Sequence, residues 1–418
     1  MHGTYPSDIV IESETATGLR RLKMRNAVVV SGARTPVGRF GGAFKDISAP
    51  DLGAAAIKTA IDRAGITPNM VDEVVIGNAI QAAEAGYAAR LASIRSGIPH
   101  ETPTMAINRQ CSSGLEAINV GAQLIKTGEA EIVVAGGAEN MSQVPFLVNY
   151  QARFDGLRMG DSTLQDGLTD GLGCPVNRYH MGVTAENVAE RFDVSREDQD
   201  ELAMISHQRA VAAIENGTFE SQITDIEVPQ RRSDPIIVST DEGPRANTTV
   251  ESLSNLRPVF KKDGTVTAAN SSSISDGAAA LVIMTLEEAE KRNIKPLARI
   301  ISHSTNSQEP AWFTTAPIGA IKKVLEKASW KLNDVDLFEI NEAFAVVPMA
   351  AMKDLSLSAD IVNIHGGACA LGHPVGTSGA RIIATLITAL EKYNLDKGVA
   401  SLCIGGGEAT AIAIEKFK

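Results

Sequence analysis

Cysteine is scarce in this sequence, with four residues in a chain of 418. Cys111, Cys174, Cys369 and Cys403 lie far apart, and no two of them have the CxxC spacing of a zinc site. So few scattered thiols exclude the dense disulfide framework of a small secreted protein. We therefore expect reduced cysteines, a cytoplasmic protein and no metal site.

Long apolar runs and an excess of basic residues are also missing. Apolar runs such as residues 27–30 and 132–135 have the length of a strand, so no membrane-spanning helix is expected. The formal net charge of −11 argues against a nucleic-acid surface, although a local arginine cluster can still bind an anion. Residues 1–23 show neither a signal-peptide core nor a transit-peptide pattern, and we expect a disordered extension there.

What the sequence does contain is an α/β texture that occurs twice. Short β-branched segments alternate with longer helical ones. Residues 64–78 match residues 328–342 at a constant offset of 264, and both place a Val-Asp pair at the start of a predicted strand. An amphipathic helix precedes each match, at residues 51–63 and 317–327, and further matches follow in the same order.

Many α/β proteins share a helix–turn–strand texture, but the order of successive matches favours a duplication. We therefore predict two similar α/β halves related by a pseudo-twofold axis. Residues 24–141 with 276–294 would form the N-terminal half, and residues 295–418 the C-terminal half. Residues 142–275 lack the repeat and are predicted to be an inserted loop domain, in which Cys174 would be exposed.

Cys111 is the candidate nucleophile. It lies in the segment Asn-Arg-Gln-Cys-Ser-Ser-Gly at residues 108–114, and the apolar spacing that follows predicts a helix starting just after it. A helix N-terminus favours negative charge, so we expect a lowered pKa for this thiol. The alternative is a buried structural cysteine, which is the commoner role of an isolated cysteine.

His373 is the candidate base, in a Gly-rich segment at residues 366–376 that ends in His-Pro-Val-Gly. Pro374 is incompatible with a helix interior, so the next helix should begin near residues 377–380, with His373 in a loop before it. In the repeat, His373 is the counterpart of Cys111, and a pseudo-twofold would bring the two helix starts face to face. The alternative is a surface histidine or one satisfied within the core.

Two further segments place polar or glycine residues at strand ends. Cys403 lies in an apolar strand that runs into Gly405 and two more glycines, whose N–H groups could bind an anionic oxygen. Asn341 follows the predicted strand 337–340 and could reach the same cleft. Glycine-rich turns after strands are also common connectors, so neither segment is specific alone.

Together these segments resemble the signature motifs of the thiolase family. The matching segments, in family order, are residues 29–40, 108–114, 265–279, 341–344, 366–379 and 403–407. The resemblance extends from about Met24 to the C-terminus. It implies a thiolase-like α/β fold, in which two duplicated halves form a layered α-β-α-β-α core with an inserted loop domain.

The resemblance implies that Cys111 carries the acyl group as a thioester and that His373 takes the thiol proton. Cys403 would remove or return the α-carbon proton of the acetyl thioester. Backbone N–H groups of Cys111 and Gly405 would bind the acyl oxygen, and His373 with a water held by Asn341 would bind the enolate oxygen. Such chemistry needs no metal and no permanently bound cofactor, because coenzyme A and acetyl-CoA are substrates.

The resemblance also implies contacts to coenzyme A, mainly from the insert. The expected residues are Arg232 at the nucleotide phosphates, Ser272 and Ala268 along the pantetheine, His180 and Met181 at the pantetheine and acyl end, and Ala343 and Phe344 closing the tunnel. Arginine suits phosphate through its forked donors, although Arg231-Arg232 could equally be a solvated loop pair.

The implied activity is that of a short-chain enzyme. Residues 180–187 (His-Met-Gly-Val-Thr-Ala-Glu-Asn) resemble acetoacetyl-CoA thiolases, in which Met crowds the acyl pocket. The reaction would be reversible Claisen condensation of two acetyl-CoA to acetoacetyl-CoA and coenzyme A, or thiolysis of a 3-ketoacyl-CoA. Residues 312–317 differ from the usual Met-Gly-Thr-Gly-Pro, and residues 171–179 are longer than in short-chain biosynthetic members. The alternative is a 3-ketoacyl-CoA thiolase of longer-chain β-oxidation.

Other classes are disfavoured. A ketoacyl synthase pairs its cysteine with two histidines or with His and Asn, whereas here Cys403 takes that place. A non-catalytic acyl-CoA or lipid-binding protein on the same scaffold would be expected to lack at least one reactive residue. This sequence has all four, namely Cys111, Asn341, His373 and Cys403. No GxGxxG opens a helix after the first strand, so a dinucleotide-binding oxidoreductase is poorly supported. By family analogy we expect a homodimer or homotetramer.

Overall fold

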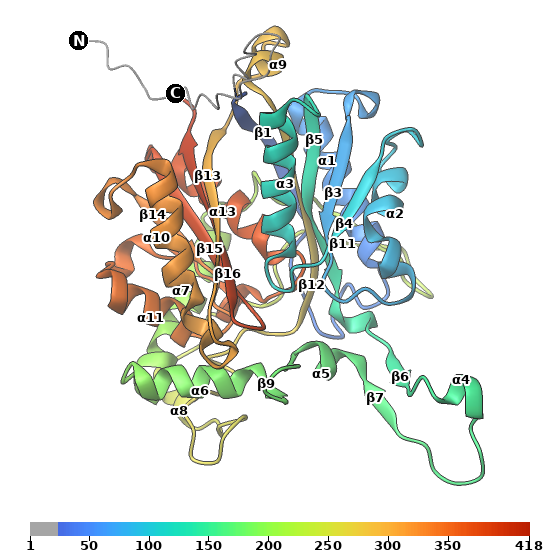
Figure 1. Ribbon diagram of the computed structural model, residues 1–418, viewed down its shortest axis with the longest axis vertical. Helices are drawn as coiled ribbons and strands as arrows, with labels where there is room; N and C mark the ends of the chain where they lie inside the picture. The colour runs from blue at the N-terminus through green and yellow to red at the C-terminus, as the bar shows by residue number, and fades with distance from the viewer. Residues whose placement is uncertain (1–23) are drawn as a thin grey trace, which may run out of the picture.

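A computed structural model of the chain describes residues 24–418, so the expected disordered extension at residues 1–23 lies outside the described residues. Strands and helices alternate along the chain (Figure 1). The strands are β1 (Ala27–Arg34), β2 (Gly38–Arg39), β3 (Glu73–Gly77), β4 (Thr104–Ile107), β5 (Ile132–Asn140), β6 (Phe146–Val148), β7 (Leu164–Asp166), β8 (Gly173–Cys174), β9 (Tyr179–His180), β10 (Ile226–Val228), β11 (Ile236–Val238), β12 (Ser275–Thr285), β13 (Ala298–Ser307), β14 (Leu337–Ile340), β15 (Lys397–Ile404) and β16 (Glu408–Lys416).

The helices lie between these strands. The α-helices are α1 (Ala49–Ala64), α2 (Ala88–Arg95), α3 (Ser113–Thr127), α4 (Ala152–Asp155), α5 (Gly167–Gly171), α6 (Met181–Arg191), α7 (Arg196–Glu215), α8 (Val250–Ser254), α9 (Leu286–Lys291), α10 (Ala316–Ala328), α11 (Val346–Leu355), α12 (Ala368–Leu371) and α13 (Ser378–Lys392). The 3-10 helices are η1 (Pro68–Met70), η2 (Ala83–Tyr87), η3 (Met141–Gln143), η4 (Pro310–Thr315), η5 (Leu332–Asp334) and η6 (Ala359–Ile361). Within residues 24–418 no helix is both long and apolar enough to cross a membrane.

The strand order confirms the predicted duplication. A 10-stranded sheet follows the path β14-β15-β16-β13-β1-β12-β5-β3-β4, with β2 pairing to β12. Read outward from the β1–β13 junction, each half has the same plan. Two antiparallel pairings (β1–β12 and β12–β5, or β13–β16 and β16–β15) are followed by one parallel pairing (β5–β3, or β15–β14). The two halves therefore share one topology and meet along β1 and β13.

The repeated Val-Asp pairs have the same structural role in both halves. The Asp72 carboxylate accepts the N–H groups of Glu131 and Ile132, both at 2.9 Å, where β5 begins beside β3. The Asp336 carboxylate likewise accepts two N–H groups at the start of β15, including that of Lys397 at 2.8 Å. Each aspartate satisfies backbone donors that the sheet leaves unpaired at this point. This explains why the pair recurs at a constant offset.

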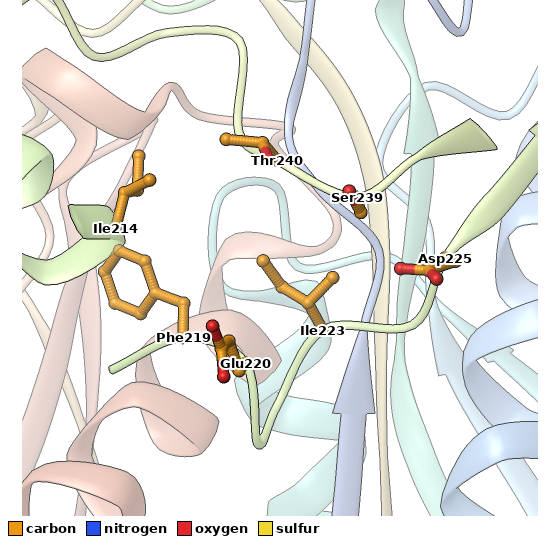
Figure 2. Close-up of a pocket in the computed structure, with 7 residues that line it drawn as sticks. All are labelled: Ile214, Phe219, Glu220, Ile223, Asp225, Ser239 and Thr240. Carbon is orange, nitrogen blue, oxygen red and sulfur yellow. The ribbon is translucent and has the colours of Figure 1, made fainter. Parts of the chain in front are cut away.

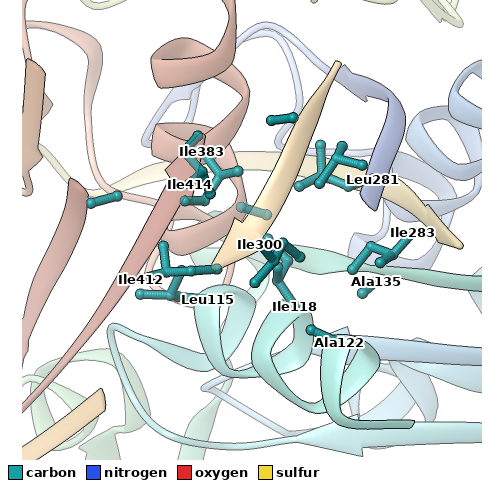
Figure 3. Packing of buried hydrophobic residues seen from close by; sticks show 14 of the residues in the cluster. Leu115, Ile118, Ala122, Ala135, Leu281, Ile283, Ile300, Ile383, Ile412 and Ile414 are labelled. Atoms are coloured by element: carbon teal, nitrogen blue, oxygen red, sulfur yellow. The ribbon is translucent and has the colours of Figure 1, made fainter. Parts of the chain in front are cut away.

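Three apolar clusters define five layers. The central cluster combines apolar side chains of α3 and α13 with the facing sides of both half-sheets (Figure 3). A second cluster packs α1 and α2 on the outer face of the first half-sheet, and a third packs α10 and α11 on the outer face of the second. Each fully buried Leu or Ile in these clusters contributes about 1.5–3 kcal/mol of hydrophobic stabilisation. The result is the expected α-β-α-β-α core.

Two glycines allow α3 and α13 to touch at their first turns. A methyl group on Gly379 would lie 2.2 Å from the backbone nitrogen of Leu115, and one on Gly114 would lie 2.8 Å from the carbonyl oxygen of Gly376. Such distances are too short for any side chain, so only glycine fits. Because Cys111 precedes α3 and His373 precedes α13, this contact brings the two candidate residues to the same place.

The region between β5 and β12 carries the additional helices and hairpins. It includes α6 and α7, the β10–β11 hairpin, and an arm of β6, α4 and β7 that extends away from the core (Figure 1). The expectation that Cys174 is exposed is wrong, because its side chain is 2% exposed in β8. Its thiol accepts the N–H of Asn177, so it supports a turn. All four cysteines are free, as predicted.

Candidate active site

The structure brings the five predicted catalytic residues together from both halves. Cys111 lies two residues before α3, and His373 lies in the loop between α12 and α13. Asn341 follows β14, Cys403 is near the end of β15, and Gly405 begins the turn after it. Since β14 and β15 are parallel neighbours, their ends reach the same edge of the sheet, where the starts of α3 and α13 also meet.

The Cys111 thiol is held in its neutral form. Burial raises its pKa to about 11, while the backbone N–H groups of Gly405 and of Cys111 itself lower it and the negative charge of Glu139 raises it further. The lowered pKa expected from the helix start is therefore wrong in sign, because the cost of burying the charge exceeds the help from the N–H groups. Cys111 consequently needs a base to become a nucleophile.

His373 is suited to be that base. Its imidazole is buried, and burial together with the charge of Arg381 lowers its pKa to about 3, so the ring is neutral at physiological pH. The Oγ of Ser378 lies 2.5 Å from Nδ1 and donates its own proton to the carbonyl of Pro374 at 3.1 Å. Nδ1 must then carry the ring proton, so Nε2 has a lone pair that can accept a proton.

Ser378 was not predicted as a site residue, although Ser378-Gly379 matches Ser113-Gly114 of the first half at an offset of 265. Its Ala variant should lower kcat about 10- to 100-fold with KM changed less than about threefold, because the imidazole tautomer would no longer be fixed. Steady-state kinetics of Ser378→Ala beside Ser378→Thr, which retains a hydroxyl, will check this. Equal kcat in the Ala variant and wild type would show that the tautomer is set by other contacts.

Asn341 and Cys403 complete the polar atoms of the site. The amide nitrogen of Asn341 lies 3.5 Å from His373 Nε2, and its Oδ1 is buried with no hydrogen-bond partner among residues 24–418. Cys403 is fully buried, and burial with the nearby charge of Cys111 raises its pKa well above the ordinary value. Both thiols are therefore protonated at rest, and Asn341 has a carbonyl oxygen available to a ligand.

The residues predicted for the acyl end of coenzyme A adjoin this site. The terminal methyl of Met181 packs on Gly405, and a methyl group built on Gly405 would lie 2.7 Å from it. His180 stacks on Phe260 at 4.6 Å between ring centroids, and Phe260 meets Phe344 edge-on at 6.0 Å. An aromatic wall thus connects α6 with the segment after Asn341.

The residues predicted to contact the pantetheine and the phosphates of coenzyme A lie in different parts of the structure. Ser272 donates its backbone N–H to the carbonyl of Ala343 at 3.0 Å, so these two are in contact. Ala268 is exposed in the same loop. Arg232 lies exposed between β10 and β11, a hairpin whose apolar residues pack on the first half, and it forms no ion pair with residues 24–418. The role of Arg232 stays a prediction.

One surface pocket is separate from these residues. It has a volume of about 250 Å³ and is lined by Ile214, Phe219, Glu220, Ile223, Asp225, Ser239 and Thr240, from the end of α7 and the loops around the β10–β11 hairpin (Figure 2). None of the predicted catalytic or coenzyme A residues lines it.

Known proteins match this chain over nearly all of its described residues. A family model described as the N-terminal domain of thiolase matches residues 27–287, and one described as the thiolase C-terminal domain matches residues 294–416. A curated relative from Staphylococcus aureus (strain COL), named probable acetyl-CoA acyltransferase, is 48% identical over 396 residues, covering 94% of this chain and 100% of the relative.

Solved structures are similar in fold as well as in sequence. The crystal structure of the Bacillus anthracis acetyl-CoA acetyltransferase has a TM-score of 0.92 and 43% identity, covering 94% of this chain and 99% of that one. The human mitochondrial 3-ketoacyl-CoA thiolase in complex with CoA has a TM-score of 0.90 and 42% identity, covering 94% and 98%.

Proposed function

Because this chain belongs to the thiolase family and is therefore an acyltransferase, we propose that it condenses two acetyl-CoA into acetoacetyl-CoA and coenzyme A, reversibly, through an acyl group on Cys111. One observation carries the proposal. Two thiols, Cys111 and Cys403, lie close enough for the charge of one to shift the pKa of the other, beside a neutral imidazole. Storing an acyl group and moving an α-proton need two such groups in one site.

The first half-reaction transfers an acetyl group to Cys111. His373 Nε2 accepts the thiol proton as the sulfur attacks the thioester carbonyl of acetyl-CoA. The N–H groups of Gly405 and Cys111 face the thiol and can hold the oxyanion that forms. When the carbon–sulfur bond to coenzyme A breaks, the imidazolium returns its proton to the leaving thiolate, and His373 is neutral again.

The second half-reaction forms the carbon–carbon bond. His373, neutral again, accepts the proton of Cys403, and the resulting thiolate removes a proton from the α-carbon of a second acetyl-CoA. The enolate carbon then attacks the acyl carbonyl on Cys111. The carbon–sulfur bond to Cys111 breaks as acetoacetyl-CoA forms, and the Cys111 thiolate takes the proton that His373 holds, which restores the resting site. His373, with a water on the free Oδ1 of Asn341, would stabilise the enolate oxygen.

The wild-type protein tests the proposal directly. Purified protein is mixed with acetoacetyl-CoA and coenzyme A, and acetyl-CoA formation is followed, while mass spectrometry of the Cys111 peptide after brief exposure to acetyl-CoA detects an acetyl adduct. We expect turnover and an adduct confined to Cys111. Binding of acetyl-CoA without an adduct would instead favour a non-catalytic acyl-CoA-binding protein.

Thiolysis of longer 3-ketoacyl-CoA is the second candidate, favoured by the similarity to the human mitochondrial 3-ketoacyl-CoA thiolase. In this chain Met181 packs on Gly405, and Phe313 meets Phe344 edge-on at 6.5 Å, so bulky side chains border the acyl position. This arrangement supports a preference for short acyl chains.

Shortening Met181 should relax that preference. In Met181→Ala the rate with a six-carbon 3-ketoacyl-CoA, relative to acetoacetyl-CoA, should rise at least about tenfold, since one or two methylenes of pocket space are worth that much discrimination. Met352→Ala is the matched control, because Met352 borders the same apolar cluster from α11. An unchanged ratio in Met181→Ala would place the length limit elsewhere.

The coenzyme A contacts and the assembly are part of the same proposal. Arg232 would meet the nucleotide phosphates, and Ser272, Ala268, His180, Met181, Ala343 and Phe344 the pantetheine and acyl end. A homodimer or homotetramer would cover β4, an edge strand whose Met105 is 41% exposed, and the arm around Phe154, which is 78% exposed. The free thiols fit a reducing compartment such as the cytoplasm.

A further inference from the structure

Glu139 is a buried carboxylate that the reaction described above does not use. It lies near the end of β5 with 1% of its surface exposed. Among residues 24–418 it has no cationic partner, since no ion pair involves it. Burying an unpaired charge is costly, so its retention beside the catalytic cysteine calls for a physical reason.

Four N–H donors converge on this carboxylate. One oxygen accepts the backbone N–H of Ala79 at 2.8 Å and that of Gly376 at 2.8 Å. The other accepts the amide of Asn78 at 2.9 Å and the N–H of Ile80 at 3.3 Å. Burial raises the pKa of Glu139 to about 7, and these donors lower it. All four partners are donors, so the carboxylate is the form that satisfies every bond.

The donors belong to the segments that frame the catalytic residues. Gly376 is three residues after His373, and its carbonyl oxygen packs against β5. A methyl group built on Gly137 would lie only 2.1 Å from this oxygen. On the other side, Ala79 accepts the side-chain amide of Asn108 at 2.8 Å, at the start of the segment that carries Cys111. Glu139 therefore joins the segment of His373 to the segment of Cys111 across the two halves.

We propose that Glu139 is a positioning residue that sets the placement of His373 relative to Cys111, by holding the Gly376 turn and the Ala79 loop on one carboxylate. The proposal rests on the proposed function for its kinetic consequence. Its electrostatic consequence is independent of turnover, because the negative charge of Glu139 disfavours the Cys111 thiolate.

Glu139→Gln tests both consequences. The amide has the same size, but its NH2 would face two donors, so either the Ala79–Gly376 pair or the Asn78–Ile80 pair loses its acceptor. We expect kcat for thiolysis to fall at least about 30-fold while KM for both substrates changes less than about threefold. Loss of the charge should also raise the rate of Cys111 alkylation by iodoacetamide at pH 8 at least about threefold, read from the Cys111 peptide by mass spectrometry.

Two further variants separate positioning from general stability. Glu139→Asp keeps the charge and the acceptors but is one methylene shorter, so the alkylation rate should stay near wild type and kcat should recover part of the loss. Asp336→Asn is the matched control, because Asp336 also accepts two backbone N–H groups but lies at the far end of β14 from Asn341. It should leave kcat and Cys111 alkylation unchanged.

The titratable groups coupled to Cys111 by charge are Glu139 from β5 and Cys403 from β15, and His373 precedes α13, whose first turn touches that of α3. Because these groups can titrate, alkylation rates are measured at several pH values. Only variants with melting temperatures equal to that of the wild type are compared, so that a loss of stability does not affect the result. A kcat within about threefold of wild type in Glu139→Gln, or an alkylation profile that does not move, overturns the proposal. A wild-type protein without thiolase turnover would overturn the proposed function instead, while the alkylation comparison still decides whether Glu139 acts on Cys111.

Discussion

Replacing Cys111 with alanine is expected to lower kcat by at least about 10,000-fold and to abolish the acetyl adduct. Without this sulfur the proposed mechanism has no carrier for the acyl group, because Cys403 is assigned to the α-proton. Losses of this size follow removal of a nucleophile from other acyl-transfer enzymes. Turnover of acetoacetyl-CoA with coenzyme A, and the mass of the tryptic peptide that contains residue 111, are the measurements.

Cys174→Ala is the matched control for this variant. Its thiol is buried in the insert and supports a turn at Asn177. Kinetics within about threefold of wild type are expected. If Cys111→Ala kept more than about one hundredth of the wild-type turnover, a thioester on Cys111 could not be on the main route.

Replacing Cys403 with alanine should separate the two half-reactions. The site would lose the group that moves the α-proton, so condensation should fall about 100- to 10,000-fold. Acetylation of Cys111 depends on His373 and the N–H of Gly405, which remain, so its rate should fall less than about tenfold. The acetylation rate is measured by quenching the reaction at short times and following the acetyl adduct on the Cys111 peptide. The condensation rate is measured at steady state on the same preparation.

The high pKa values of the two thiols sharpen this expectation. Burial raises both pKa values, so both sulfurs are protonated at neutral pH and neither is a thiolate before substrate binds. In the proposed mechanism each thiol therefore loses its proton only as the substrate reacts. The Cys111 proton passes to His373 in the first step, and the Cys403 proton passes to His373 in the second, before Cys403 takes the α-proton. A Cys403→Ala enzyme that condensed acetyl-CoA at the full rate would show that another group moves the α-proton.

Local sequence patterns predicted much of the scaffold correctly. The Val-Asp pairs marked equivalent strand starts, and both aspartates accept N–H groups in the way a repeated structural role requires. The helix after Cys111 begins at Ser113, and the one after His373 begins at Ser378. Apolar periodicity, proline and glycine influence the backbone conformation of residues only a few positions away. Their effects can therefore be predicted directly from the sequence.

Electrostatics and burial could not be read in this way. The pKa of Cys111 was expected below its ordinary value and lies above it, because residues from β5 and β15 enclose the thiol. Cys174 was expected to be exposed and is buried. No local pattern indicates which distant segments will exclude water from a side chain.

The sequence by itself determined the two α/β halves, the helix starts that carry Cys111 and His373, and the strand ends that carry Asn341 and Cys403. Only the tertiary structure decided that Ser378 fixes the imidazole tautomer and that Glu139 joins the two catalytic segments. Secondary structure follows from short-range preferences, whereas hydrogen-bond partners and desolvation depend on residues that only the packed core brings together.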